Sequence, residues 1–458
     1  MSSVRERLLR HKQASTKSVT SSSDEPISRV NVQAETLLNS TQDERTDTAT
    51  YVPALEPAWS IIGAELSSNT MGSFLLRRKS FSLSEFQGIY RLGELMTHAS
   101  ELIAFHDDKD SDQFTERSML FLDTETTGLG IGAGNVPFMI GIGYYEQDAF
   151  VVEQLFIRNP AEELAMLHYL QTLVQQFTHL VTYNGRTFDW PLIVNRFILN
   201  RLSTDSHELK HIDLLHPSRS LWKNTLPTCK LSQVEVDRLG VLRYDDVPGS
   251  LAPALYFQYL AEGNPTILHG VFKHNEQDIV TLASLVIHFG KLLSGTLDLS
   301  LVPLEEQFRS ALWLAKMNKH DLADEYLDHI WQELLYGAFS DEGHSVWRGD
   351  LPLRLASCYK QKHEHQRAVA LWHRWIDTRS SGLPTMIQPY IELAIYYEHR
   401  ERNYDKALSL SNIAYNMLRK RRTLRRSQTV DSVEELDLKK RMERLRTKSQ
   451  KLGNARKQ

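Results

Sequence analysis

The sequence predicts an α/β domain, built from a mixed sheet covered by helices, followed by an all-α domain of helical hairpins. Three apolar strand patterns come in succession at 119–123, 136–145 and 149–157, and a helical segment separates them from a fourth at 179–183. Successive strands that then alternate with helices are typical of a mixed sheet with helices on its faces. After residue 302 the strand patterns stop and helical periodicity continues alone.

Composition indicates a folded protein with several domains. The 458 residues suggest two to four domains at roughly 100–200 residues each. Apolar residues make up 41% and charged residues 24%, which allows a packed core and excludes wholesale disorder. No apolar run approaches the roughly 18 residues of a membrane span, so we expect no membrane partner. With two distant cysteines, Cys229 and Cys358, and no secretory signal, a cytoplasmic protein without a disulfide framework or zinc ribbon is expected.

The net charge of −4 hides an uneven distribution along the chain. Residues 419–458 hold 15 Lys or Arg against 5 Asp or Glu, a balance of +10, so the rest of the chain sums to −14. This basic segment is either a solvated tail or a sequence-independent contact to phosphates, which would be sensitive to salt.

These patterns divide the chain into five expected parts. Residues 1–50, with 16 Ser or Thr and no aromatic residue, form a disordered lead because little apolar surface offsets the ordering entropy. The others are a lead-in at 51–116, the sheet domain at 117–295, the helical hairpins at 303–418 and the basic tail at 419–458.

Small residues mark the three expected hairpins. Each pair has one alanine in an apolar helix and one at the start of the partner helix, twelve or thirteen residues later: Ala311 and Ala323, Ala356 and Ala368, Ala394 and Ala407. Small side chains let paired helices approach closely, and the spacing resembles a degenerate tetratricopeptide array. Such an array would offer a surface to a protein partner, whereas the alternative is a plain helical bundle.

Two acidic residues close the first strand of the sheet domain. Asp123 and Glu125 are two apart, so both side chains lie on one strand face and Thr124 lies on the other. Adjacent carboxylates repel, and the arrangement is stable chiefly when a hard cation holds them together. The alternative interpretation is a solvated turn.

A third acid follows the fourth strand. The turn at Asn184-Gly185 precedes a helix whose first turn contains Asp189. Its charge there suits the helix dipole, which is one explanation. The other is that the turn places Asp189 opposite the carboxylates of the first strand.

The last candidate pair lies on a late helix. His274 and Asp278 are four residues apart and share a helix face, either as a surface pair or as part of a site. Glu276 points elsewhere and is expected to be a solvated acid.

Together these motifs resemble the DEDD exonuclease superfamily, which has a ribonuclease-H-like fold. They are Asp-x-Glu on the first strand, Asn-x-x-x-x-Asp at a strand-to-helix junction and His-x-x-x-Asp on a late helix. The phrases GLGIGAGNVPFMIGIGYY, TYNGRTFDWPLI, HIDLLHPSR and HNEQDIVTL resemble the bacterial YprB-type ribonuclease-H-like domain family. The resemblance covers roughly residues 70–295, and helical hairpins fit the family's longer members.

The resemblance implies a metal-dependent nuclease, specifically a 3′–5′ exonuclease on single-stranded DNA or RNA. Asp123, Glu125, Asp189 and Asp278 would hold two Mg²⁺ or Mn²⁺ ions. Two such ions can activate water and stabilise the leaving oxygen of a phosphodiester.

Other residues receive roles by the same resemblance. Asn184 would either line the substrate site or fix its turn, and Phe188 and Thr126 would contact the substrate, although Phe188 is either a base-stacking residue or simply core. Asp213 is either a fifth acid near the metals or a helix cap, and we prefer the cap. Arg243 is either a phosphate contact or a solvated arginine.

The identity of the general base departs from the superfamily pattern. There it is a His five residues before the final Asp or a Tyr four before it, whereas His274 stands at the tyrosine spacing. An imidazole with a pKa near ~6.5 could deprotonate water at neutral pH, so His274 as base is a hypothesis.

Two other functions remain open. A catalytically silent nucleic-acid-binding or adaptor protein could use the hairpins to recruit a partner, although retention of all four acids argues against it. A ribonuclease-H-type endonuclease on RNA–DNA hybrids shares the fold and metals, but the helical His-x-x-x-Asp favours the exonuclease.

Overall fold

The structure, a computed structural model, describes residues 57–106, 114–128, 130, 132, 134–203, 209–337, 349–378, 386–424 and 433–455. These residues belong to a single unit of the chain. The expected disordered lead at 1–50 lies outside them. Within the described ranges, we find no helix with the length and apolar character needed to cross a membrane.

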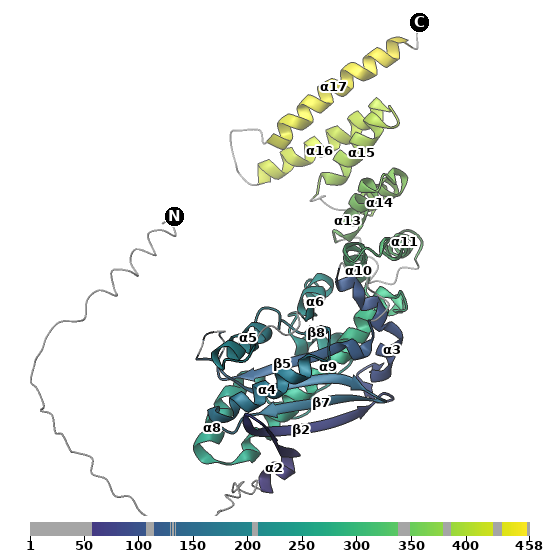
Figure 1. The fold of residues 1–458 in the computed structure, drawn as a ribbon. Helices are drawn as coiled ribbons and strands as arrows, with labels where there is room; N and C mark the ends of the chain where they lie inside the picture. Colours follow the sequence, from purple (N-terminus) through teal and green to yellow (C-terminus); the bar gives the residue numbers. More distant parts are fainter. Residues whose placement is uncertain are drawn as a thin grey trace, which may run out of the picture. The chain divides into compact units, whose positions relative to one another are not determined.

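A mixed seven-stranded sheet forms the first half of this unit, as the sequence predicted (Figure 1). Its order is β1-β2-β7-β6-β5-β8-β9. The strands are β1 (Ala64–Asn69), β2 (Gly72–Ser82), β5 (Met119–Thr126), β6 (Pro137–Glu146), β7 (Ala149–Phe156), β8 (His179–Thr182) and β9 (Lys210–Asp213). All neighbours are antiparallel except β5, β8 and β9, which run parallel and so end at the same edge.

The two outermost strands were not expected from the sequence. β1 is an edge strand in which only Ala64 is buried, so it lacks the alternation of apolar residues that signals a half-buried strand. β9 is only four residues long and has two buried positions. Both strands extend the predicted sheet, and β1 and β2 come from the segment expected to be a lead-in. A separate ribbon joins β3 (Phe86–Gln87) to β4 (Tyr90–Arg91).

Helices cover both faces of the sheet (Figure 1). The α-helices of this half of the chain are α2 (Pro57–Ile62), α3 (Leu95–His98), α4 (Glu163–Val174), α5 (Asp189–Leu199), α6 (Leu215–Trp222), α7 (Leu231–Val234), α8 (Ala252–Glu262) and α9 (His269–Leu293). Side chains alternate along β5: Leu120 and Leu122 join a core with α4, α5 and α8, while Met119 and Phe121 join a core with most of α9. The acids that follow on β5 inherit this alternation.

Two glycines on β6 let α9 approach the sheet closely. A Cβ at Gly143 would lie 2.5 Å from Cγ2 of Ile279, and one at Gly141 would overlap the amide of Asn275. Any larger residue would therefore push the helix away. This close approach brings α9 to the end of β5.

The second half consists of packed helical pairs, as the alanine pattern predicted. The pairs are α10 (Leu304–Lys316) with α11 (His320–Tyr336), α13 (Leu351–Gln361) with α14 (His365–Asp377), and α15 (Gln388–His399) with α16 (Tyr404–Leu424). All six alanines of the pattern are buried. Core residues run from the α9 face of the sheet into these pairs without interruption.

The basic tail contains a packed helix, so its interpretation as a solvated tail is wrong for these residues. Helix α17 (Val433–Ala455) contacts α16, and its buried face presents apolar residues at helical spacing: Leu438, Met442 and Leu445. The buried carboxylate of Glu398 on α15 accepts hydrogen bonds from Arg444 Nη2 and Lys448 Nζ, both at 2.9 Å. Part of the tail's positive charge is therefore used inside the fold.

Candidate active site

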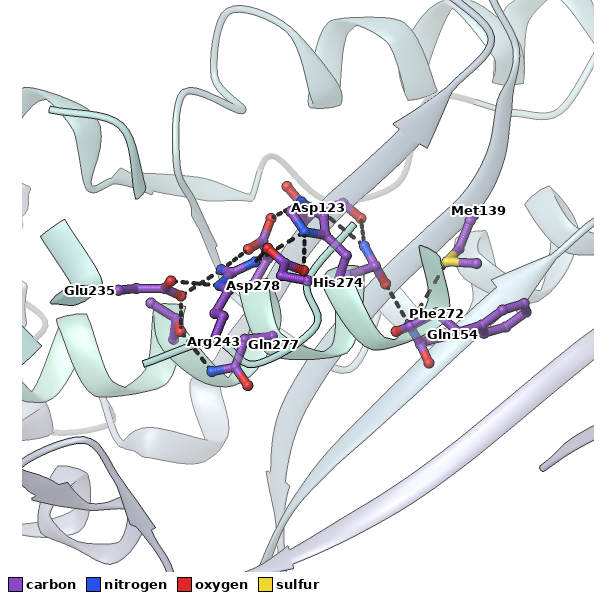
Figure 2. A network of polar contacts seen from close by, with 12 residues as sticks. Asp123, Met139, Gln154, Glu235, Arg243, Phe272, His274, Gln277 and Asp278 are labelled. Carbon is purple, nitrogen blue, oxygen red and sulfur yellow. Dashed lines mark hydrogen bonds and ion pairs between the residues drawn. The ribbon is translucent and has the colours of Figure 1, made fainter. Parts of the chain in front are cut away.

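Asp123 and Glu125 lie at the end of β5 on the face covered by α9, while Thr124 points to the other face. Asn275 of α9 donates from Nδ2 to Asp123 Oδ2 at 3.0 Å (Figure 2). Asn275 is fully buried. Its amide is neutral, so it holds the carboxylate of Asp123 without adding a charge. The strand and the helix are thus joined at the first acid.

A second buried amide fixes Asn275. Gln154 on β7 donates from Nε2 to Asn275 Oδ1 at 3.0 Å and to the backbone oxygen of Phe272 at 2.7 Å. Neither residue was predicted from the sequence. Each could have been recognised as a polar residue at a buried position: Gln154 lies within an apolar strand and Asn275 on the buried face of a helix. Such residues point to a polar network, because buried polar groups need hydrogen-bond partners.

Asp189 reaches the site from the other face of the sheet. It is the first residue of α5, and Thr124 Oγ1 donates a hydrogen bond to its Oδ1. Burial raises the pKa of Asp189 to about 6, although the hydrogen bond from Thr124 works in the opposite direction. Thr124, which points to the face of β5 opposite Asp123 and Glu125, therefore links Asp189 to the strand that carries those two acids.

Asp213 accepts backbone hydrogen bonds at the start of α6 and in the turn before α5. Its Oδ1 accepts the backbone N–H of Leu215 at 3.0 Å and that of Asn184 at 2.8 Å, while Oδ2 accepts the N–H of Arg186 at 3.2 Å. Asn184 has a left-handed backbone, with φ of 71°. Asp213 therefore stabilises the turn that leads to Asp189, and its carboxylate is already engaged by backbone donors.

Asp278 on α9 is paired with an arginine. Arg243 Nη2 donates to Asp278 Oδ1, and the Arg243 side chain is only 9% exposed. Arg243 also makes two bonds of 2.6 Å to Glu235. The expectation of a solvated arginine is thus wrong, and its bonds go to carboxylates.

His274 lies between two carboxylates. Its Nδ1 is 2.8 Å from Asp246 Oδ1, and its Nε2 is 3.5 Å from Asp278 Oδ2. Nδ1 is also 3.1 Å from Arg243 Nη1, which can only donate. The neutral ring therefore either donates through Nδ1 to Asp246 or accepts at Nδ1 from Arg243, and the first choice leaves Nε2 free to accept a proton.

The negative charges of the acids act on one another. Burial raises the pKa of Asp123 well above its usual range, and the charges of Asp278, Asp189 and Glu125 raise it further. Burial likewise raises the pKa of Glu125, followed by the charges of Asp278, Asp189 and Asp246. The structure thus brings all four predicted acids close enough to repel.

The three residues predicted to contact the substrate differ in their burial and in their hydrogen bonds. Thr126 is buried and donates from Oγ1 to the backbone oxygen of Gly128 at 2.6 Å, so it shapes the turn after β5. Asn184 is exposed, and its Oδ1 accepts from Thr187 Oγ1 at 3.1 Å. Phe188, directly before α5, is half-buried.

Glu276 is not the solvated acid that was expected. It accepts a bond of 2.5 Å from Arg77 and one of 2.6 Å from Lys79, both on β2. It therefore ties α9 to the sheet away from the four acids.

The carboxylate oxygens of the four acids are ligands that hard divalent cations prefer. Such cations would also relieve the mutual repulsion of the four carboxylates. Within the described ranges, no three His, Cys, Asp or Glu side chains already converge as metal ligands do. Asp189 and Asp278 are instead engaged by Thr124 and Arg243. The donor set fits a divalent cation by its chemistry.

The sheet, its covering helices and the acids at the end of β5 define a ribonuclease-H-like domain. In agreement, the profile of the RNase_H superfamily matches residues 120–289, which contain all four acids. The chain is also 34% identical, over 346 residues, to the uncharacterized protein YprB of Bacillus subtilis (strain 168). This alignment covers 74% of the chain and 79% of that protein. The chain therefore belongs to the YprB family and carries a domain of the ribonuclease H superfamily.

Proposed function

We propose that this protein is a metal-dependent nuclease, a 3′–5′ exonuclease that hydrolyses single-stranded nucleic acid. The observation that carries the proposal is the meeting of Asp123, Glu125, Asp189 and Asp278 from β5, α5 and α9, with charges that raise the pKa of both β5 acids. Membership of the ribonuclease H superfamily supports phosphodiester chemistry at this position.

These four carboxylates would hold two Mg²⁺ or Mn²⁺ ions. When bound, such ions would polarise the phosphate and activate water. Asn275 keeps Asp123 oriented through a 3.0 Å bond, and Thr124 does the same for Asp189. The amide and the hydroxyl add no positive charge, so the site keeps its attraction for cations.

His274 would accept a proton at Nε2. When Nδ1 donates to Asp246, the Nε2 lone pair faces the side of Asp278, which places the base beside the acids. The Asp246 carboxylate also stabilises the imidazolium that forms.

Labelled substrates test this function directly. Single strands of DNA and RNA, labelled at either the 5′ or the 3′ end, are incubated with Mn²⁺ beside an Asp123→Ala variant. A ladder from 5′-labelled strands and early release of the 3′ label, both lost in the variant, is the expected result. Internal cutting of an RNA–DNA hybrid would instead indicate a ribonuclease-H-type endonuclease. No metal-dependent product on any substrate would contradict nuclease activity.

A specific observation favours one other candidate, a silent adaptor that uses the helical pairs to bind a protein. Arg243 already satisfies one oxygen of Asp278 without a metal. The discriminating measurement is the melting temperature with and without Mn²⁺. A nuclease site gives a Mn²⁺-dependent rise that Asp123→Asn removes, whereas a silent domain gives no Mn²⁺-dependent change in either protein.

A further inference from the structure

Arg243 bonds to both Glu235 and Asp278 in the polar network of Figure 2, although it belongs to none of the acidic motifs. It is on the loop that leads from η6 (Glu235–Leu239) to α8, three residues after Gly240, which has φ of 65°. Its side chain is almost completely buried. The partners of a buried guanidinium determine what it does, because all of its N–H groups need acceptors.

Glu235 anchors one side of the guanidinium. Arg243 Nε donates to Glu235 Oε2 and Nη2 donates to Oε1, both at 2.6 Å, which is the parallel two-bond geometry of an arginine–carboxylate pair. The Glu235 side chain has no exposed surface, and Thr281 Oγ1 on α9 donates to its Oε1. The direction of the guanidinium plane is therefore set by a group that cannot itself move freely.

The remaining N–H groups reach the candidate site. Nη2 also donates to Asp278 Oδ1, and Nη1 donates to Asp246 Oδ2 at 3.3 Å. Asp246 in turn contacts His274 Nδ1 at 2.8 Å. One guanidinium thus bonds to the last acid of the motif and reaches the candidate base both directly, with Nη1 3.1 Å from His274 Nδ1, and through Asp246.

We propose that Arg243, held by Glu235, is a positioning residue that sets the orientation of Asp278 and, through Asp246, of the His274 ring; this inference rests on the proposed function. Arg243 and Glu235 thereby become part of that site, each with a different role. Glu235 fixes Arg243, and Arg243 fixes the two groups that act.

The charges indicate that this action is geometric. The positive charge of Arg243 is matched by the negative charge of Glu235, so the pair as a whole is neutral. Glu235 therefore offsets part of the positive charge that Arg243 brings to the four acids. A lysine, with a single point charge, cannot make the same parallel bonds to Glu235 while reaching Asp278.

The chain offers a matched control on the same short segment. Arg238 forms a comparable two-bond pair with Glu306 of α10, with Nε 3.0 Å from Oε2, but it contacts none of the four acids. Arg238→Gln therefore breaks a similar ion pair outside the site.

The experiment is a calorimetric titration of the full-length protein with Mn²⁺ alone. Arg243→Gln and Arg243→Lys should each bind Mn²⁺ about 10-fold more weakly than the parent, since groups that orient ligands typically contribute about 10–100-fold to affinity. Arg238→Gln should bind like the parent. The melting temperature in EDTA verifies that each variant is folded. If Arg243→Gln does not fold, Glu235→Gln keeps the arginine, breaks its anchor and carries the same expectation.

A second readout follows the His274 ring. Its proton–nitrogen NMR correlations, assigned by comparison with His274→Ala, should change in Arg243→Gln and remain unchanged in Arg238→Gln.

Three outcomes would overturn the inference. Equal or tighter Mn²⁺ binding by Arg243→Gln would show a counter-ion that competes with the metal. Full affinity in Arg243→Lys would show that charge alone matters. An unchanged His274 spectrum in Arg243→Gln would remove the link through Asp246. If the parent protein itself does not bind Mn²⁺, the proposed function fails together with this inference, whereas parental binding with unaffected variants overturns the inference alone.

Discussion

The side-chain amide of Asn275 lies directly over Gly141, at a place where a Cβ on the strand would overlap it. The same amide holds Asp123 at 3.0 Å. A backbone position on β6 therefore controls the first acid of the site through one intervening side chain.

We expect Gly141→Ala to displace Asn275 and with it Asp123. Overpacking of this kind costs about 1–3 kcal/mol of unfolding free energy, measurable by urea denaturation. Mn²⁺ binding should weaken as well. Gly134→Ala is the control, because no atom lies within 4 Å of the position that its Cβ would occupy. Equal stability and Mn²⁺ affinity in the two variants would contradict the close contact.

The metal-free protein should lose stability as pH rises toward neutrality. Burial raises the pKa of Asp189 to about 6 in the folded protein, whereas an unfolded chain has an Asp pKa of about 3.9. Between these values the folded state binds the proton more tightly, so this contribution is fully present below about pH 4 and is lost as pH rises through about 6. A shift of this size corresponds to roughly 2–3 kcal/mol.

Urea denaturation in EDTA between pH 5 and pH 7.5 measures this effect. Asp189→Asn should reduce the slope, because an amide keeps the acceptor for Thr124 without titrating. The raised pKa values of Asp123 and Glu125 should maintain the rest of the slope. Asp148→Asn, on an exposed turn, should leave the slope of the parent unchanged. If the unfolding free energy of Asp189→Asn depends on pH as steeply as that of the parent, Asp189 does not contribute to this dependence.

The pH–rate profile tests His274 as the general base. His274→Ala should lower the rate by about 100-fold or more and remove the acidic limb of the profile, since a positioned acid–base group contributes about 10²–10⁴-fold. His274→Tyr restores the superfamily's residue at this spacing and should recover part of the rate with a different profile. Identical rates and profiles in all three proteins would exclude His274 as the base.

Glu398 should determine whether α17 stays attached to the helical pairs. Its carboxylate has no exposed surface and bonds to three basic residues of α17: Arg441, Arg444 and Lys448. Glu398→Gln removes the negative charge that these cations share and leaves them a single acceptor oxygen. Because the cations are partly exposed, the cost should stay below the roughly 3–5 kcal/mol of breaking a fully buried ion pair. Amide exchange in residues 433–455 should accelerate, whereas Glu434→Gln, on the exposed side of α17, should leave it unchanged.

Acid should release α17 in the parent protein. Burial by itself would raise the pKa of Glu398. The hydrogen bonds from Arg444 and Lys448 have the larger combined effect and lower this pKa to about 2. Its stabilising contribution is therefore fully present above the unfolded pKa of about 4.3 and is lost as pH falls through about 2. If exchange in α17 is the same in the parent and in Glu398→Gln at neutral pH, this ion cluster does not hold the helix.

Residues at short, regular spacings were the most predictable part of the fold. Alternation along β5 correctly separated Asp123 and Glu125 from Thr124, and paired alanines correctly indicated three helical hairpins. These patterns are local, because strand and helix geometry alone converts spacing into a shared face.

Partners distant in sequence could not be predicted in the same way. Asn275, Gln154 and Glu235 carry no motif. A packed α17 was not among the alternatives for the basic segment, because the buried partner of its cations, Glu398, lies in another helix. Arg243 was noticed, yet its acceptors come from two different segments of the chain. Such pairings depend on which segments pack together, which no spacing within one element records.

The sequence by itself determined the class of fold, because this follows from periodicity and from the order of elements along the chain. It also singled out the four candidate acids, through the family resemblance of their motifs. Only the tertiary structure decided how the acids are held. Close packing of α9 against Gly141 and Gly143 brings Asn275 to Asp123, and the buried Glu235 directs Arg243 toward Asp278. The physical reason is that burial makes every polar group require a partner, and the fold chooses which partner is within reach.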